Sequence, residues 1–374
     1  MFSCNADMLV EYSQSAKRAN TISFTSCVTG TTRSANAAGP KVFFESGDVL
    51  HVHAGYADGS TYFLDEFVKG SGYFTSERGF GWPDLSAGPL TFTAFWNATQ
   101  PQAGLLQGYA PDAEAGSQKD ILVARHQSVE PEEVVMLNFR HILSQVSVKV
   151  KNSNPTFNVI ISGARIGYLK TASEQFLYSG GVTDHTDAET VSQGDWTLVD
   201  FQQQGDNQTM ANLYKYDQDV SLTLTGVHDV TALEGFQPWI ILPQDMKRFE
   251  ENDGNRLYEH RTLNGITDAS GRALPDLSGT YIALKMRIEY MYEGKVVAPL
   301  ADQWCYWPID RLANWNPGWC YSYIIDVATG GYHGDDQNDD GVLDPVLKHI
   351  VFDPDCTIDQ WDQTDDMEIS GNLP

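Results

Sequence analysis

Apolar and polar residues alternate with a period of two along most of this chain. The stretch VLHVHAGY places Leu50, Val52 and Ala54 on one side, and LTFTAFW, ISFTSCV and VSVKVKN repeat the pattern. Glycine, asparagine, aspartate and proline separate these stretches. Alternation of this kind between turn residues is typical of half-buried strands. The chain is therefore predicted to be built mainly from short β-strands.

Helical signals are few and short by comparison. No amphipathic stretch exceeds about two turns, whereas the mean helix of a globular protein has about three. The best helical candidates are LDEFVKG and DRLANW. The pattern as a whole predicts an all-β fold, with two β-sandwiches favoured over one large barrel.

The length of the chain agrees with two domains. Its 374 residues fit two units at roughly 100–200 residues per domain. We expect a flexible segment over residues 1–20, a first β-sandwich domain over residues 21–144 and a larger second one over residues 145–374. The boundary is placed near residues 143–145, inside a continuous train of strand patterns. Polar insertions in the second domain are predicted to be surface loops.

Charge narrows the range of partners. The chain has 24 basic and 50 acidic residues, for a formal net charge of −26. This balance disfavours nucleic acid, which needs a basic footprint, and it disfavours direct docking on anionic lipid. The sequence has no apolar run of 18 residues or more that would predict a membrane-spanning helix. The opening residues MFSCNADMLVEYSQSAKR contain neither the basic nor the apolar region of an intact signal peptide.

Five cysteines leave at least one thiol outside any internal disulfide. No CxxC spacing occurs, so no zinc site is predicted. In an exported protein a disulfide between Cys305 and Cys320 is one available pairing. Cys4, in MFSC, has two interpretations: the trimmed end of a lipobox carrying a lipidated cysteine, or an unmodified cysteine in a loose N-terminus.

Catalytic signatures are absent from the sequence. It has no GxSxG elbow, no Cys-His signature and no HExxH motif. Its many carboxylates are scattered, and nothing in the sequence brings two of them together across a cleft. His51 and His53 lie two apart on one predicted strand face, where they are either solvated or paired on a metal. We therefore predict that the protein is not an enzyme and has no cofactor, with calcium as the one candidate ion.

The candidate calcium site lies in the stretch HGDDQNDDGVLDPVLKH. An EF-type loop places oxygen ligands at alternate positions before a glycine turn, and this register is matched by Asp336, Asn338, Asp340, Val342 and Asp344. The twelfth position is Leu347, where a bidentate glutamate is needed. Two interpretations stay open: a weak calcium loop, or an acidic turn without metal.

A tryptophan-dense stretch, QWCYWPIDRLANWNPGWCYSY, offers a candidate ligand surface. Exposed aromatic rings stack on sugars, and the candidate residues are Trp304, Trp307, Trp315 and Trp319. The alternative is that these rings pack in the core and cap a sheet.

The order of several motifs resembles the fimbrillin-like proteins of Bacteroidota, which include the subunits of type V pili. HILSQVSVKVKN followed by FNVIISGARIGYLKT is similar to the central signature of that family. ISFTSCVTGTTRSA is similar to its first strand, QKDILVA to a common internal segment, and CYSYIIDV through IVFDPDCTIDQWDQ to its C-terminal end. The resemblance spans residues 21–363. It implies two transthyretin-like Greek-key β-sandwich domains in tandem, export, lipidation of Cys4 and display at the outer membrane or in a fimbria.

The resemblance also implies a route of assembly. Pilus subunits of the family mature by cleavage after an arginine in the first-strand loop, and a strand from a neighbouring subunit then fills the vacated groove. Arg33 in GTTRSA matches the cleavage position, and the replaced strand would carry Ile22, Phe24 and Val28. The expected partners are other fimbrial subunits bound by β-strand addition.

Two functions remain after this reading. The first is a fimbrial subunit or accessory adhesin of the cell surface. The second is a free-standing surface lipoprotein that binds a glycan or host protein through exposed tryptophans. In both, contact with a membrane comes only through a lipid anchor.

Overall fold

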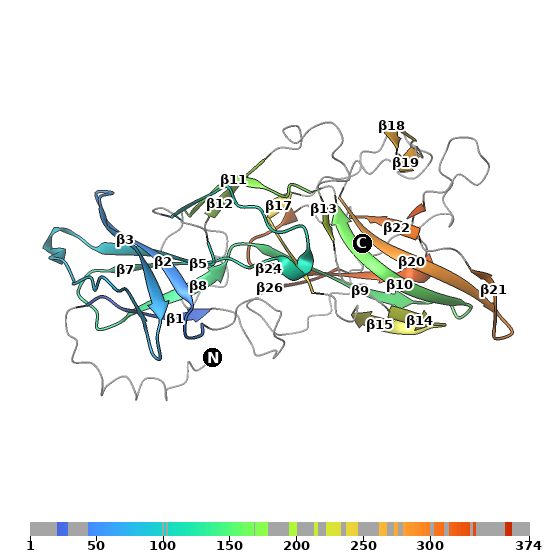
Figure 1. Cartoon of the computed structure of the whole chain (residues 1–374), viewed down its shortest axis with the longest axis horizontal. Helices are drawn as coiled ribbons and strands as arrows, with labels where there is room; N and C mark the ends of the chain where they lie inside the picture. The colour runs from blue at the N-terminus through green and yellow to red at the C-terminus, as the bar shows by residue number, and fades with distance from the viewer. Residues whose placement is uncertain are drawn as a thin grey trace, which may run out of the picture.

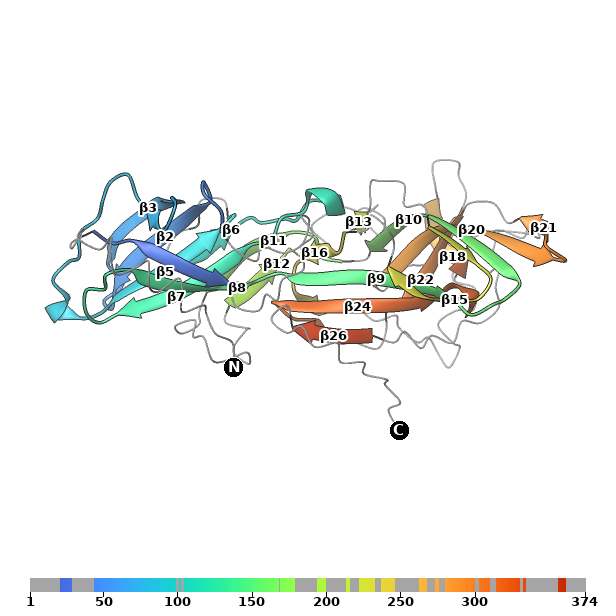
Figure 2. The ribbon, with the colours of Figure 1, turned by 90° about the horizontal axis from the view of Figure 1, so that it is seen from below.

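The computed structural model describes residues 21–28, 44–98, 101, 104–167, 169–178, 194–199, 213–215, 222–232, 237–245, 262–267, 273–275, 280–299, 303–309, 314–329, 332–333 and 356–360. Strands dominate these residues, and their helical segments are single 3-10 turns: η1 (Leu85–Ala87), η2 (Ala115–Ser117) and η5 (Val327–Thr329). The predicted all-β class is confirmed. The molecule is elongated, with one group of strands at each end and a smaller group between them (Figures 1 and 2).

Seven strands of the first half join edge to edge into a closed barrel with the order β1-β4-β3-β2-β5-β7-β8. Their bounds are β1 (Phe24–Val28), β2 (Val49–Tyr56), β3 (Thr61–Lys69), β4 (Phe74–Thr75), β5 (Leu90–Trp96), β7 (Leu122–Ser128) and β8 (Val135–His141). All neighbours are antiparallel except β1 and β8, which are parallel. The first half is thus closed by its first strand, where the sequence predicts a sandwich.

The core of the barrel is aromatic. Phe24 lies at its centre, with its ring centroid 4.8 Å from that of Phe67 and 5.1 Å from that of Phe92, both in edge-on geometry. Rings in this arrangement add to the stability gained from burial alone. The predicted inward positions Leu50, Val52 and Ala54 on β2 are fully buried, as the period-two pattern requires.

The predicted helix LDEFVKG is wrong, because Leu64–Lys69 lie in β3. Phe63 and Phe67 are the buried apolar positions of that strand. A spacing of four satisfies the inner face of a strand as well as one side of a helix. In the other candidate, DRLANW, only Asn314 and Trp315 are described, and they form β23.

The second half contains two larger sheets. The first has the order β13-β10-β20-β22-β25, with β14 added to β10 and β21 to β20. Its strands are β10 (Phe157–Gly167), β13 (Leu213–Lys215), β14 (Leu222–Thr225), β20 (Tyr281–Tyr292), β21 (Lys295–Pro299), β22 (Gln303–Pro308) and β25 (Tyr332–His333). The second has the order β15-β9-β24-β26, with β16 added to β9. Its strands are β9 (Ser144–Asn152), β15 (His228–Ala232), β16 (Trp239–Ile241), β24 (Trp319–Asp326) and β26 (Cys356–Gln360).

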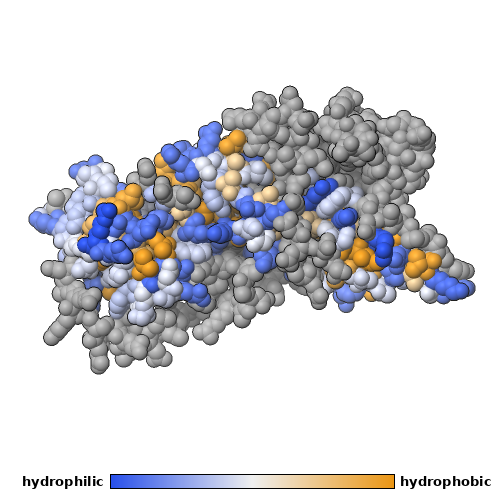
Figure 3. All heavy atoms as spheres, viewed as in Figure 1, coloured by the Kyte–Doolittle hydropathy of each residue, from blue (hydrophilic) through white to orange (hydrophobic). Residues whose placement is uncertain are grey.

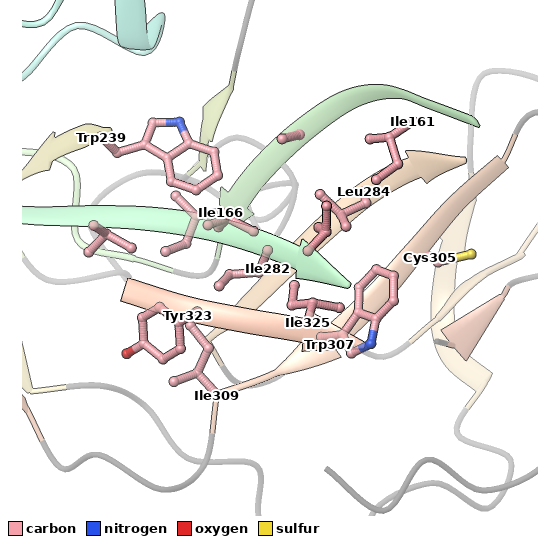
Figure 4. Close-up of a cluster of buried hydrophobic side chains, with 14 of the residues drawn as sticks. Ile161, Ile166, Trp239, Ile282, Leu284, Cys305, Trp307, Ile309, Tyr323 and Ile325 are labelled. Carbon is pink, nitrogen blue, oxygen red and sulfur yellow. The ribbon is translucent and has the colours of Figure 1, made fainter. Parts of the chain in front are cut away.

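These two sheets enclose a common core. Side chains of β9 and β24 from one sheet meet those of β10, β20 and β22 from the other. Figure 4 shows Trp239, Trp307 and Tyr323 among the aliphatic side chains of this cluster. This arrangement agrees with a β-sandwich, while the transthyretin-like Greek-key order of the two domains stays a prediction.

A third sheet joins the two halves. Its order is β12-β11-β6, with β6 (Leu105–Gln107), β11 (Ser173–Tyr178) and β12 (Gly194–Leu198). Strand β6 precedes β7 and β8 of the barrel in the chain, and it pairs with β11 of the second half. Two two-stranded sheets complete the described fold: β17 (Gln244–Asp245) with β23 (Asn314–Trp315), and β18 (Thr262–Thr267) with β19 (Ala273–Pro275).

Apolar surface on the first half is divided into small areas. Leu64 and Val68 on β3 are 44% and 41% exposed, and Met136 on β8 is 39% exposed. Figure 3 shows hydrophobic patches over the first half that are separated by hydrophilic side chains. On this face, therefore, the described surface offers no single large apolar area.

Candidate functional site

The candidate site is the β1 seam, which we define as β1 with its two neighbours β8 and β4. Five consecutive residues of β1 pair in parallel with β8, from Phe24 opposite Val135 to Val28 opposite Phe139. On its other side β1 meets β4 through one pair, Phe24 opposite Phe74. Strand β1 is therefore held along one edge and barely held along the other.

Hydrogen bonds fasten the start of the seam. The amide of Val135 donates to the carbonyl of Ser23 over 3.0 Å, and the amide of Ile22 donates to the carbonyl of Phe80 over 2.7 Å. On the outer side, the Cys27 thiol donates to Asn138 Oδ1 over 3.3 Å. These contacts fix the register of β1, while most of its hold on the barrel comes from its buried side chains.

The apolar side of β1 fills the barrel. Ile22, Phe24 and Val28 are 1%, 0% and 8% exposed, as the alternation in the sequence predicts. Burial of one such side chain contributes about 1.5–3 kcal/mol. Removal of β1 would therefore uncover an apolar channel in the barrel and the hydrogen-bonding edge of β8.

Three sequence predictions lie outside the described residues: Cys4, Arg33 and the candidate calcium ligands Asp336, Asn338, Asp340, Val342 and Asp344. In the part of the chain that is described, no group of three or more His, Cys, Asp or Glu side chains is arranged to hold a metal ion.

The histidine pair of β2 has separate partners. His51 Nδ1 lies 3.6 Å from Glu66 Oε1, and His53 Nε2 lies 3.0 Å from Thr61 Oγ1. Burial, and secondly the charge of Arg125, lower the pKa of His53, so its ring is neutral at physiological pH. The two imidazoles thus serve the packing of β2 against β3.

The four tryptophans of the candidate ligand surface divide into two groups. Trp307 and Trp315 are 2% and 1% exposed and belong to the second core, so these two rings pack the protein and offer no surface to a ligand. Trp319 is partly buried and packs against the same core. Trp304 lies on the other side of β22, where the guanidinium of Arg165 sits 3.9 Å from its ring centroid.

The Cys305–Cys320 disulfide, which the sequence left open, is not formed. Cys305 carries a free thiol and is 2% exposed on β22, whereas Cys320 lies on β24 in the opposite sheet. Burial raises the pKa of the Cys305 thiol to about 12. A thiol of this kind is inert at neutral pH because only the thiolate is a nucleophile.

The sequence did not reveal β8 as the partner of β1. VMLNFRH shows the alternation of a strand, but alternation indicates which side chains face inward and not which strand lies alongside. The parallel pairing joins residues more than one hundred positions apart, such as Cys27 and Asn138, and no local signal encodes it.

Among the described residues, no helix has the length and apolar character needed to cross a bilayer. No curated protein matches the chain. A family model described as fimbrillin-like matches residues 19–267, which is more than half of the chain.

Solved structures of Bacteroides and Parabacteroides proteins show a distant overall likeness. A fimbrial protein from Bacteroides vulgatus is 12% identical, with 81% of this chain and 94% of that chain covered and a TM-score of 0.45. A proposed cell adhesion protein from Bacteroides ovatus is 13% identical over 88% and 99% of the two chains, with a TM-score of 0.43. A fimbrial assembly protein from Parabacteroides distasonis is 10% identical over 81% and 90%, with a TM-score of 0.35. Because these identities and TM-scores are low, no role of an individual residue is transferred from these structures to this chain.

Proposed function

The chain belongs to the fimbrillin-like family, and on that premise we propose that it is a fimbrial subunit or accessory adhesin whose strand β1 is exchanged for a strand of a neighbouring subunit. Family membership supports the coarser role, a fimbrial or adhesive protein outside the cell. Cleavage after Arg33, strand exchange at the seam and a lipid on Cys4 are the finer parts of the proposal. No described residue argues for catalysis.

One observation supports the exchange most directly. Strand β1 ends at Val28 and β2 begins at Val49, so Arg33 lies between the strand that closes the barrel and the remaining barrel strands. A cut after Arg33 would detach β1 and no other described strand. The detached strand would be held by five parallel pairs on one side, and on the other by one pair with β4, the bridge between Thr21 and Gly81 and the hydrogen bond from Ile22 to Phe80.

The physical chemistry of the vacated seam favours strand addition. An uncovered β8 edge presents unpaired amides and carbonyls, which readily take up another strand. Main-chain hydrogen bonds would then supply the pairing, and alternate apolar side chains would fill the pockets left by Ile22, Phe24 and Val28. An incoming strand needs no other chemistry than the one that β1 now supplies.

Limited digestion with an arginine-specific protease tests this proposal. We expect one early cut after Arg33, an N-terminus at Ser34 by sequencing, and oligomers or filaments in the electron microscope. Arg78 is an internal reference, because its side chain is 72% exposed and it lies in the same half. Cleavage at Arg78 as fast as at Arg33 would mean that Arg33 is not a processing site, and Arg33→Ala should abolish the early cut alone.

The opposite result points to the second function. Resistance at Arg33 together with a stable monomer would favour a free-standing surface lipoprotein that binds a glycan or host ligand. A glycan array would then be the next measurement, with Trp304→Ala as the variant, since Trp304 lies outside the buried tryptophan pair of the core.

A further inference from the structure

Strand β8 is fastened at two different places. Along Val135–Phe139 its recorded ladder partner is β1. At its other end the ladder pairs are with β7, namely His141 with Leu122 and Arg140 with Val123. Withdrawal of β1 would therefore leave the wall of the seam dependent on the second fastening.

That second fastening continues into a buried hydrogen bond between a histidine and a carboxylate. His141 Nδ1 lies 2.6 Å from Asp120 Oδ2, and the two side chains are 1% and 4% exposed. The carbonyl of Asp120 also accepts a hydrogen bond from Asn97 Nδ2 over 2.8 Å. A hydrogen bond excluded from water to this degree is costly to break, because water does not replace the lost partner, so the end of β8 has one strongly preferred position.

The two residues after β8 are held by the second half. The indole N–H of Trp196 on β12 donates to the carbonyl of Ile142 over 2.8 Å, and the amide of Gly318 donates to the carbonyl of Leu143 over 2.8 Å. Ile142 and Leu143 are 4% and 0% exposed. The end of β8 is thus clamped by groups that the barrel itself does not supply.

We call the β12-β11-β6 sheet with the core beneath it the joint. Three residue pairs connect β6 to β11, and main-chain bonds extend the contact, such as Ser173 N to Tyr109 O at 2.8 Å. The ring of Trp196 lies 4.8 Å from that of Phe176 and 5.9 Å from that of Tyr109. Rings from both halves therefore surround the hydrogen bond from Trp196 to Ile142, and none of these contacts involves β1.

We propose that the joint keeps the wall of the seam in place when β1 is withdrawn, so that the groove persists empty until another strand arrives. This inference rests on the proposed function and adds a positioning role for Trp196 and for the Asp120–His141 pair. Because neither hydrogen bond involves β1, detaching β1 leaves the bonds from Trp196 to Ile142 and from Gly318 to Leu143 in place. The second half then acts as the holder of a site that lies wholly in the first half.

The test uses the full chain with a site for a sequence-specific protease inserted between Arg33 and Ser34. The chain is nicked, the N-terminal fragment is removed by gel filtration, and a fluorescent peptide of residues 21–28 is titrated in reducing buffer. Fluorescence anisotropy gives its affinity, and hydrogen exchange reports on the amides of β8. An engineered cut makes the experiment independent of whether Arg33 is processed naturally.

Two joint variants and one control separate the clamp from general stability. Trp196→Ala removes the ring and the donor, while Trp196→Phe keeps a ring and removes the N–H, in case the alanine variant fails to fold. Tyr323→Phe is the control, because it deletes a hydroxyl that accepts a 3.0 Å hydrogen bond from the indole of Trp315 in the second core, away from the seam.

We expect the nicked wild-type protein to bind the peptide and, before peptide is added, to protect the amides at the end of β8 that pairs with β7, such as that of Ile142, which donates to the carbonyl of Ile121. Trp196→Ala should bind at least tenfold more weakly and Trp196→Phe at least threefold, with faster exchange in β8, while Tyr323→Phe stays within twofold. Equal affinity in all four proteins would overturn the inference, and so would a wild-type groove that neither binds nor protects β8. If Arg33 resists its protease but these differences appear, the joint inference stands and the processing proposal falls.

Discussion

Among the described strands, each half has one parallel pair: β1 with β8 where the barrel closes, and β9 with β24 in the middle of a sheet. In the first half, β1 and β8 share five residue pairs, and β1 meets β4 through one more. In the second half, β9 and β24 share seven, and each of them has an antiparallel neighbour on its other side. Removal of a strand from the centre of a sheet would break ladders on both of its sides, whereas the closure point of the barrel is where the proposed exchange would break the fewest pairs.

The difference follows from the position of the strands in the chain. Strand β1 is the first described strand, and twenty residues separate it from β2. Strand β24 lies between β9 and β26 in its sheet. Exchange of β24 would break two ladders and open the core around Trp307 and Trp315. Exchange of β1 opens only the seam.

The largest expected effect is from Phe24→Ala. Loss of a fully buried phenylalanine costs about 3–5 kcal/mol, and Phe24 also loses two edge-on ring contacts. We expect the free energy of unfolding of the first half, from urea titration followed by tyrosine and tryptophan fluorescence, to fall by about 4 kcal/mol. Thr25→Ala, at the next position of the same strand, should lower the free energy of unfolding far less. Equal losses in the two variants would show that Phe24 is not part of the barrel core.

The next effect is at the end of β8, next to the joint. Asp120→Ala removes the carboxylate that buried His141 contacts, and loss of a buried hydrogen-bond partner costs about 1–3 kcal/mol. The control is Glu66→Ala, which removes the carboxylate 3.6 Å from His51, where the Glu66 and His51 side chains are 65% and 23% exposed. A partly exposed pair contributes about 1 kcal/mol or less. Similar losses in both variants would show that burial does not distinguish the two pairs.

The sequence predicted one of these regions better than the other. Ile22, Phe24 and Val28 were identified because alternation reports directly on which side of a strand is buried. The joint escaped prediction because β6 has three residues, too few to show a period, and because Trp196 lies in a polar insertion that was predicted to be a surface loop. Trp196 nevertheless donates a 2.8 Å hydrogen bond to the carbonyl of Ile142. Its partner is distant in the chain, so the composition around Trp196 could not predict this contact.

A smaller effect distinguishes the second core by pH. Burial raises the pKa of Cys305 from 9.0 to about 12, so the folded state keeps the proton that the unfolded state loses above pH 9. The resulting stability is fully present below pH 9 and is lost as the pH rises toward 12. Between pH 8 and pH 10 we expect a loss of about 1.4 kcal/mol from this group, measured as the difference between wild type and Cys305→Ala. Parallel pH profiles for the two proteins would contradict it.

The smallest effect returns to the seam. Cys27→Ala removes the thiol that donates to Asn138 Oδ1 over 3.3 Å, a weak bond at a partly buried position, and the unfolding free energy should fall by about 0.5 kcal/mol or less. In the nicked protein the same change should speed release of β1 only slightly, because the buried side chains Phe24 and Val28 supply most of the hold. A release rate raised more than tenfold would contradict this expectation. It would mean that contacts on the outer face of β1, and not its buried side chains, control the release of the strand.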